Sequence, residues 1–549
     1  MISAFPNMQS RRGGGSSVQD ATIRDFSGGL RRVDNQVGMK SSYAPVLNNI
    51  VRDSEKSAKI RYGYKEVATA SDNIVEIIRF GGSLLLFLED GTIEKVNPDY
   101  STTPIWNTAI AAALPGTPDA WAAGVTHIDT AGFKSDLIVV NGVDKPLIID
   151  KDLNVNYLQD PATGSNIYTP IAKYITVIGD FVVMAGGADT LTLYFSSKNT
   201  AGVWQGDADP NNATSYVLSS QPGSSAEITA IAGFRNFLVV FFLDSIVVMN
   251  VGTFDAAGNH TPSVHDSYSD IGSVNHKTLF TTNNDLVFAS NKGVFTAARN
   301  LFSGSIEASP VSEALGIEFL NEMSSLDVSS SENFVVRDES ELRVFFFFKL
   351  LDGSQRVYIL SHSASFSNLH WASASNLPMT TGCHTQRKRT FFASGDKVYQ
   401  YGNRVFDGEE NYADNITAAN PEGEEIPFDW EFPWLDANKR ITTKQLVAVT
   451  MDTLGTSEFT LQAFVDKFFK DLEGNYDPAL EMKFVAGQSR GYGATNNKGY
   501  GGGRAANDER FYGMKSRFKL IKFRIFGSTK EPLTITSLSL VYRMGGLKR

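Results

Sequence analysis

The chain contains a single cysteine, Cys383, among 549 residues. An intrachain disulfide therefore cannot form, which is typical of proteins made in a reducing cytoplasm. Long apolar runs are also missing. The longest, such as residues 237–243, falls far short of the roughly 20 residues that a membrane-spanning helix needs. The first 20 residues hold no apolar stretch of signal-peptide length. We therefore expect no membrane segment and synthesis in the cytoplasm.

Recognisable catalytic and metal-binding patterns are absent as well. The seven histidines show no HExxH motif and no closely paired ligand spacing. Cys383 and His384 are adjacent, but neighbours on a strand point to opposite faces, which is poor geometry for a nucleophile and its base. The segment DKDLNVN (150–156) alternates oxygen ligands like a calcium loop, yet Val155 stands where the loop needs glycine. We expect no catalytic residue, no cofactor and no metal.

Negative charge exceeds positive charge: 60 acidic residues against 50 basic ones give a formal net charge of −10. This balance argues against an ordinary nucleic-acid-binding surface, although DNA could still slide through an acidic channel. The segment 405–436 alone carries ten carboxylates and no lysine or arginine. It is interpreted either as a solvated linker or as an acidic rim or lumen wall.

What the sequence does contain is a repeat. A turn, a dense apolar run, a second turn and another apolar run recur seven times between residues 80 and 400. The copies are spaced by about 51 residues on average, close to the ~40–50 residues of propeller blades. We predict an all-β protein whose residues 72–404 form a β-propeller of six or seven blades.

The remaining segments predict a second domain. Strands are expected over 444–452, 458–468, 517–526 and 533–542, and two or three more are needed for a sandwich. Residues 20–70 can supply them, so a β-sandwich-like domain is expected from 20–70 together with 428–549. Residues 1–19 are expected to be a flexible arm and 405–427 an acidic linker. The glycine-rich segment 490–504 lacks the spacing of a phosphate loop and is expected to be an excursion from the sandwich, either disordered or ordered against a partner subunit.

The N-terminal third resembles a known family. DFSGGL (25–30), the stretch 45–67 and FDWEFPWLD (428–436) are similar to segments of the tail nozzle proteins of short-tailed bacteriophages, also called tail tubular protein B or packaged-DNA stabilisation proteins. The residues that carry the resemblance are Gly28, Gly29, Asn48 or Asn49, Arg61, Gly63 and Tyr64, followed by Ile74, Ile77 and Phe80 in the first propeller strand.

The resemblance implies a structural virion protein rather than an enzyme. Six copies would form the nozzle of a short tail, beneath an adaptor ring and the portal. This homohexamer would retain packaged double-stranded DNA, present sites for tail fibres or spikes, and open during DNA ejection. An acidic lumen would let DNA pass without the phosphate contacts that drive DNA binding.

Two groups of residues are candidates for that role. The polar inserts 206–215 and 252–267 carry no lysine or arginine and are expected to form the gate; their carboxylates are Asp207, Asp209, Asp255 and Asp266. In the strand KSRFKLIKFR (515–524), four of the five cations are set against apolar residues, either as a solvated edge or as a subunit interface with the acidic segment of a neighbour: Arg517, Lys519, Lys522 and Arg524.

Two other functions stay open at this point. One is a carbohydrate-active or receptor-binding propeller of a phage tail, and a carbohydrate-active one would need a carboxylate pair in one funnel. The other is a monomeric interaction hub in the cytoplasm.

Overall fold

The structure of the protein is a computed structural model. It describes residues 18–32, 36, 39–53, 57–113, 121–207, 212–219, 227–256, 258–282, 285–299, 306–363, 366–385, 389–402, 411–437, 442–465, 478–486 and 517–544. Asp209 and the glycine-rich segment 490–504 lie outside these ranges, as does nearly all of the predicted arm.

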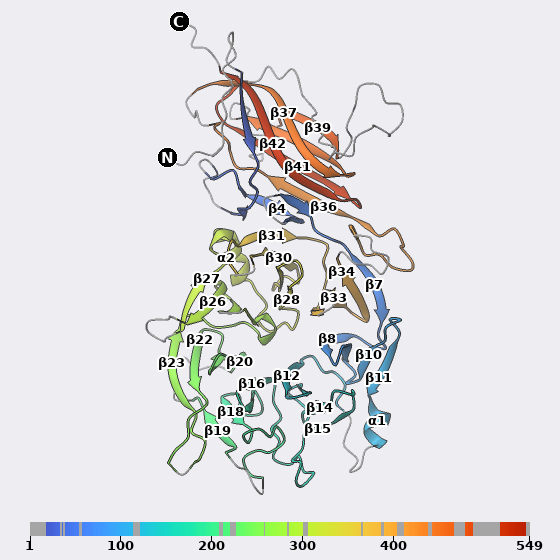
Figure 1. Ribbon diagram of the computed structural model, residues 1–549, viewed down its shortest axis with the longest axis vertical. Coiled ribbons are helices and arrows are strands. Elements are labelled where there is room, and N and C mark those ends of the chain that lie inside the picture. The colour runs from blue at the N-terminus through green and yellow to red at the C-terminus, as the bar shows by residue number, and fades with distance from the viewer. Residues whose placement is uncertain are drawn as a thin grey trace.

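Seven four-stranded antiparallel units surround a common centre, with a β-sandwich at one edge of the ring (Figure 1). Blades 1 to 3 consist of β8 (Ile74–Phe80), β9 (Ser83–Leu88), β10 (Ile93–Val96) and β11 (Thr102–Trp106); β12 (Asp129–Phe133), β13 (Asp136–Val140), β14 (Leu147–Ile149) and β15 (Val155–Tyr157); and β16 (Tyr174–Ile178), β17 (Phe181–Ala185), β18 (Thr192–Phe195) and β19 (Thr214–Val217).

Blades 4 to 7 continue the ring. They consist of β20 (Ala230–Phe234), β21 (Phe237–Phe241), β22 (Ser245–Asn250) and β23 (Ser263–Ser269); β24 (Phe280–Thr281), β25 (Asp285–Ser290), β26 (Gly293–Arg299) and β27 (Ile306–Pro310); β28 (Phe334–Asp338), β29 (Arg343–Lys349), β30 (Gln355–Ser361) and β31 (His370–Ala374); and β32 (Thr381–Thr385), β33 (Arg389–Ser394), β34 (Lys397–Tyr401) and β7 (Tyr64–Thr69).

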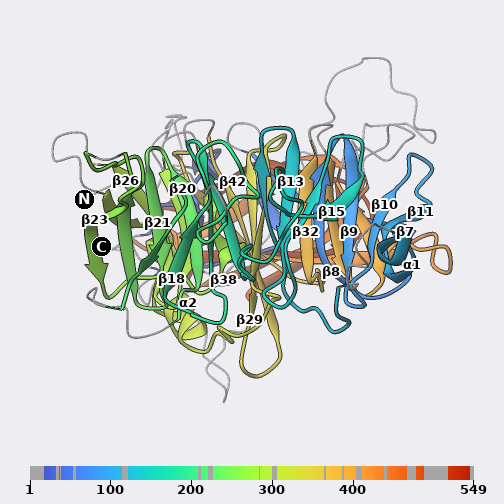
Figure 2. The same ribbon diagram turned by 90° about the horizontal axis from the view of Figure 1, so that it is seen from below.

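The ring also contains short helices between its strands. They are α1 (Thr108–Ala113), α2 (Gly316–Ser324) and two 3-10 turns, η1 (His276–Thr278) and η2 (Glu313–Leu315). Seen from its side, the ring carries α2 and the hairpin that follows β29 on the same face (Figure 2).

The apolar runs of the repeat become strands that are covered on both faces. In β21, Leu238 and Val240 belong to one buried cluster, whereas Phe237, Val239 and Phe241 belong to another. A strand sandwiched between neighbouring blades needs no polar face, so its sequence does not alternate. This explains why the repeat reads as uninterrupted apolar stretches.

The ring closes by pairing an early strand with a late one. β7 pairs antiparallel with β34, with Tyr64 opposite Tyr401 and Thr69 opposite Lys397. The last blade therefore takes its outermost strand from the N-terminal part of the chain. This closure removes the two open edges that a linear array of blades would leave.

The β-sandwich combines strands from both ends of the chain. One sheet has the order β40-β37-β42-β6-β5, with β1 also on β42, and the other has the order β4-β36-β41-β38-β39. Its strands are β1 (Val18–Ile23), β4 (Val46–Asn48), β5 (Ile50–Arg52), β6 (Ala58–Ile60), β36 (Glu424–Glu431), β37 (Lys444–Gly455), β38 (Glu458–Val465), β39 (Leu480–Val485), β40 (Arg517–Phe518), β41 (Ile521–Thr529) and β42 (Leu533–Met544). Two-residue strands β2 (Gly29–Leu30), β3 (Tyr43–Ala44) and β35 (Ala413–Asp414) flank it. The predicted fold class, a propeller with a sandwich-like domain built from N- and C-terminal segments, is confirmed.

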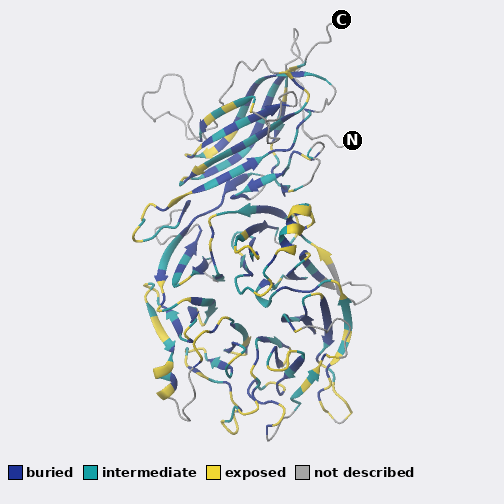
Figure 3. Ribbon diagram, turned by 180° about the vertical axis from the view of Figure 1, so that it is seen from behind, coloured by how far each residue is buried: buried dark blue, intermediate teal, exposed yellow. Residues whose placement is uncertain are grey.

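Sandwich strands alternate between buried and more exposed positions, as Figure 3 shows, because only one face of each sheet meets the core. In β38 the residues Phe459, Leu461 and Ala463 are buried, and Thr460 and Gln462 between them are not. The predicted strand 517–526 is in fact two strands. β40 pairs with β37 in one sheet and β41 with β36 and β38 in the other, so the chain crosses between sheets here.

The junction between propeller and sandwich is one continuous sheet. β4 lies between β31 of blade 6 and β36 of the sandwich, with Asn48 opposite both Ser373 and Asp429. Beside it, the buried Arg61 guanidinium binds the Asp414 carboxylate and the Ser375 carbonyl oxygen. The two domains therefore share backbone hydrogen bonds, and Arg61 links the buried Asp414 carboxylate to the Ser375 carbonyl oxygen next to β31 of the propeller.

Two glycines of the family-like motif allow this close approach. A Cβ atom on Gly63 would lie 1.9 Å from the Ala413 carbonyl oxygen. Gly29 has a φ of +75° and lies against the Trp371 backbone, where a Cβ would come within 2.9 Å. A side chain at position 29 would push the N-terminal segment off the propeller, and one at position 63 would push it off β35.

Candidate binding site in the propeller channel

The described gate carboxylates belong to blades 3 and 4: Asp207 lies between β18 and β19, Asp255 lies between β22 and β23, and Asp266 lies on β23. Asp207 is buried and accepts a hydrogen bond from the Trp204 amide at 2.6 Å. Asp255 accepts two bonds from Asn259, and Asp266 on β23 accepts one from the Tyr268 hydroxyl at 2.7 Å. Each of these three carboxylates stabilises its own loop or strand. Asp209 lies outside the described residues.

Two of the predicted interface cations bind the acidic segment of their own chain. Lys522 contacts Glu431 at 2.9 Å, and Arg524 binds both carboxylate oxygens of Asp429. These pairs form because β41 lies next to β36 in the sandwich. Arg517 is exposed on β40, and the Lys519 carbonyl oxygen accepts a bond from Lys444 at 3.0 Å. The complementarity between the cationic and acidic segments is thus at least partly intramolecular.

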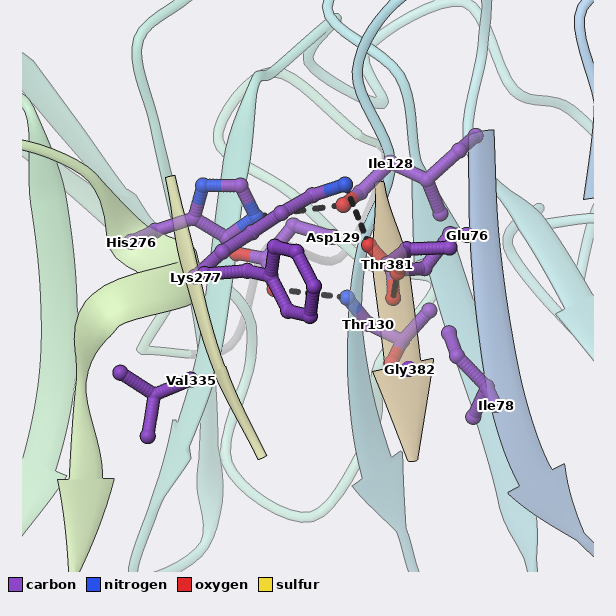
Figure 4. A pocket seen from close by; sticks show the side chains of 11 residues that line it. Glu76, Ile78, Ile128, Asp129, Thr130, His276, Lys277, Val335, Thr381 and Gly382 are labelled. Atoms are coloured by element: carbon purple, nitrogen blue, oxygen red, sulfur yellow. Dashed lines mark hydrogen bonds and ion pairs between the residues drawn. The ribbon is translucent and has the colours of Figure 1, made fainter. Parts of the chain in front are cut away.

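A different cluster of polar side chains gathers at the centre of the ring. The first strands of several blades, together with η1, surround a cavity of about 190 Å³. Figure 4 shows its lining, which comes from blades 1, 2, 5, 6 and 7: Glu76, Ile78, Ile128, Asp129, Thr130, His276, Lys277, Phe334, Val335, Thr381 and Gly382. We call this cavity the first chamber.

An ion pair between blades 1 and 5 forms one wall of the first chamber. Lys277 contacts Glu76 at 2.5 Å and also donates to the Val75 carbonyl oxygen at 3.1 Å. The Thr381 hydroxyl donates to the other Glu76 oxygen at 2.6 Å. Both charged side chains are largely shielded from solvent, with 6% of Lys277 and 13% of Glu76 exposed. The positive charge of Lys277 is therefore already matched within the protein.

The carboxyl group of Asp129 has a pKa above its usual value. Its oxygens accept bonds from the Thr130 amide at 2.8 Å and from the Ile175 amide of blade 3 at 2.9 Å. Burial raises the pKa of Asp129 to about 7, because the two amide bonds only partly offset the cost of removing the charge from water. Near neutral pH this group exists in both protonation states.

His276 lines the first chamber, and the ring of His127 packs against it at a tilt. The rings of His127 and His276 lie 4.4 Å apart, and the Nε2 of each bonds a backbone carbonyl, of Lys173 and Ile128 respectively. Burial lowers the pKa of His127 to about 4 and that of His276 well below its usual range. Both rings are neutral at pH 7. Because a carbonyl only accepts, each Nε2 carries the proton and each Nδ1 keeps a lone pair.

A second chamber of about 380 Å³ adjoins the first and shares Val335 and Gly382 with it. Its other lining residues are Arg79, Phe280, Val336, Arg337, Glu339, Cys383 and His384. Burial raises the pKa of the Cys383 thiol, so this cysteine stays protonated and unreactive at neutral pH. Burial lowers the pKa of His384, whose Nδ1 lies 3.0 Å from the Thr390 hydroxyl.

Within the described ranges, no group of three or more histidine, cysteine or acidic side chains is placed to hold a metal ion. No helix among the same residues has the length and apolar character required to cross a membrane.

Comparison with known proteins adds little beyond the architecture. No protein-family model and no curated protein matches the sequence. Among solved structures, U3-55K is 9% identical, with a TM-score of 0.38, and the match covers 62% of this chain and 98% of that one. The WD40 β-propeller domain of Doa1 is 10% identical with a TM-score of 0.33, over 62% of this chain and 98% of that one. A streptogramin B lyase is 12% identical with a TM-score of 0.35, over 62% and 97%. At these TM-scores the similarities carry no argument about function.

Proposed function

We propose that this protein is a structural virion subunit that assembles as a homohexamer into the nozzle of a short phage tail. The observation that carries the proposal is the convergence of the family-like residues. These residues are far from the acidic segment in sequence. At a single junction, Gly29 lies against the propeller, whereas Arg61 and Gly63 contact the acidic segment. Residues that join a propeller to a sandwich support the architecture of the subunit, which is what we expect in a family of structural proteins.

The dimensions of the propeller channel determine where DNA could pass. The two chambers measure about 190 and 380 Å³. Duplex DNA, whose major groove alone is about 12 Å wide, cannot thread such a space. In the proposed assembly the lumen therefore runs between subunits, around a sixfold axis. The net charge of −10 favours a lumen that releases DNA rather than binding it.

Within this proposal, the inserts 206–215 and 252–267 form the gate, with Asp255 and Asp266 facing the DNA; Asp207 is buried and supports its own loop, and Asp209 lies outside the described residues. Arg517, which is exposed on β40, is the cation proposed to reach an adjacent subunit, since Lys522 and Arg524 bind acidic residues of their own chain. The adaptor ring would bind at one end of the assembly, and fibres or spikes at its side.

The oligomeric state tests the proposal directly. Size-exclusion chromatography with light scattering should give about six times the 60.0 kDa chain mass, and negative-stain images should show sixfold rings. If the free chain stays monomeric, the same images of the virion from which it comes should contain the ring below the portal. A virion that lacks a sixfold ring of this chain rules the nozzle out.

A second candidate is a carbohydrate-active or receptor-binding propeller of a phage tail, and one observation favours it. Glu76 and Asp129 line the same chamber, where Glu76 is paired with Lys277 and the pKa of Asp129 is raised to about 7. Glycosidases commonly use a pair of carboxyl groups in one site, one of which has a raised pKa. Release of reducing ends from host surface polysaccharide, lost in Glu76→Gln, would support this candidate. Polysaccharide left intact by the wild-type protein would exclude the catalytic form of it.

A further inference from the structure

The two chambers are successive parts of one channel. On β8, Glu76 lines the first chamber and Arg79 lines the second. The same order holds on β32, where Thr381 lines the first and His384 the second. It also holds on β28, where Phe334 lines the first and Arg337 the second. A molecule that occupies both chambers therefore lies along the propeller axis.

The first chamber offers acceptors of hydrogen bonds. Asp129 and Glu76 contribute carboxyl oxygens, and Lys277, the cation of this chamber, is bound to Glu76. His276 donates through Nε2 to the Ile128 carbonyl, so its Nδ1 is an acceptor. That buried Nδ1 has no hydrogen-bond partner among the described residues. A ligand must therefore bring donors, such as hydroxyl groups, to this end.

The second chamber offers donors and positive charge. Arg337 binds the Thr281 carbonyl oxygen at 2.9 Å through Nη1, which also lies 3.5 Å from the mostly exposed Glu339. Its Nε is buried and has no hydrogen-bond partner among the described residues. The edge of the guanidinium that carries Nε and Nη2 can therefore take a carboxylate in two parallel bonds. Arg79 adds a second cation to the lining.

We propose that the channel binds a small sugar acid, with its carboxylate on Arg337 in the second chamber and its hydroxyl groups on Asp129 and His276 in the first. The volume of the first chamber lies below the ~300–1,000 Å³ of pockets for drug-sized ligands, so it fits a single sugar ring. The apolar side chains of Phe334 and Val335 provide a wall for the ring face. This inference goes beyond the nozzle role and requires no turnover.

Calorimetric titration of the full chain with sodium D-glucuronate tests the inference, with D-glucose and sodium acetate as partial ligands. Glucuronate should bind with a dissociation constant on the order of 1 mM, and each partial ligand at least about tenfold more weakly. Arg337→Gln should weaken glucuronate binding about tenfold or more, because a bond between charged groups is lost. Arg337→Lys should also weaken it, because an ammonium group cannot form the two parallel bonds.

Arg356→Gln is the matched control, since it removes one cation from β30, whose residues do not line either chamber. It should bind glucuronate like the wild type. Equal affinity for acetate and glucuronate would reduce the site to a simple anion site and overturn the proposal. The proposal would also be overturned if glucuronate gave no saturable heat, or if a folded Arg337→Gln variant bound it with unchanged affinity. Water would then be the partner of the buried His276 Nδ1 and Arg337 Nε.

Discussion

Arg61 and Asp414, which are 353 residues apart, form a two-pronged ion pair in which both side chains are 0% exposed. The same guanidinium donates to the Asn49 side chain at 2.7 Å and to the Tyr62 carbonyl oxygen at 2.8 Å. Burying two charges is costly unless every donor is used, and here Arg61 uses both ends of its fork and its Nε. The pair fixes the N-terminal segment between propeller and sandwich.

Replacing Arg61 with methionine should destabilise the protein by about 3–5 kcal/mol, because it leaves a buried, unpaired carboxylate. Urea unfolding followed by tryptophan fluorescence measures the change. Arg524→Met is the matched control: Arg524 also binds both oxygens of a carboxylate, yet 36% of its side chain is exposed. That variant should lose about 1 kcal/mol or less. Similar losses in both variants would show that the junction is not a stability centre.

A combined Arg61→Met and Asp414→Leu variant should be less damaged than Arg61→Met alone. Removing both partners eliminates the unpaired charge, and the effects of groups in direct contact are not additive. Strictly additive losses in the double variant would contradict the view that the two side chains act as one unit.

Gly63→Ala should destabilise the junction by about 1–3 kcal/mol or more, because the added methyl would lie 1.9 Å from the Ala413 carbonyl oxygen and force the backbone apart. Gly132→Ala should have little effect, because an added Cβ there meets nothing within 4 Å. Thermal unfolding of the two variants compares them. A melting temperature for Gly63→Ala equal to that of Gly132→Ala would refute the close approach.

Val240→Asp should prevent folding or cost several kcal/mol, since β21 is covered on both faces and Val240 is 0% exposed. Val217→Asp introduces the same charge on β19, where the side chain is 51% exposed, and should cost less than about 1 kcal/mol. Soluble yield and melting temperature are the measurements. Normal yield and stability of Val240→Asp would mean that the strand is peripheral.

The raised pKa of Asp129 predicts a pH dependence of stability. In the folded state the group binds its proton up to about pH 7, whereas in the unfolded chain it releases the proton near pH 4. The folded state thus holds more protons between these values, and the contribution of Asp129 to the free energy of unfolding falls as pH rises from about 4 to 7.

His127 and His276 contribute with the opposite sign, because their lowered pKa values mean that the unfolded chain holds more protons between about pH 4 and 6.5. The effect of Asp129 is therefore isolated by comparison with Asp129→Asn, which keeps both histidines. Unfolding free energies measured from pH 4 to 8 should show the wild type losing stability relative to the variant up to about pH 7 and not beyond. A constant difference across this range would show that Asp129 ionises normally.

The architecture could be predicted from the sequence because the repeated apolar runs form the cores of the blades. Successive residues of a strand that is covered on both faces are apolar, as Val239 and Val240 are in β21. Each of the seven apolar runs therefore marked one blade. The segment 517–526 was harder to interpret. The alternation of apolar and polar residues is broken once between β40 and β41, at Leu520–Ile521, and this single shift is the sequence signal of the crossing between two sheets.

The channel could not be predicted from the sequence. Glu76, Asp129 and Lys277 come from blades 1, 2 and 5, and only ring closure brings them together. Their one sequence signal is position, on or just before the first strand of a blade. Loops without lysine or arginine instead pointed to Asp207, Asp255 and Asp266. The carboxylates of these residues accept bonds from nearby residues in the same loop or strand.

The pairing of β1 with β42 has a consequence for synthesis of the chain. Thr22 and Ser539, whose hydroxyl groups are in contact across this pair, are separated by 517 residues. At about 5–20 residues per second, the first strand waits roughly 25–100 s for its partner to leave the ribosome. During that interval its edge is open to other nascent chains and to chaperones. A chain that ends before Leu533 lacks β42, the central strand of the sheet β40-β37-β42-β6-β5, and so leaves β1, β37 and β6 without their shared partner.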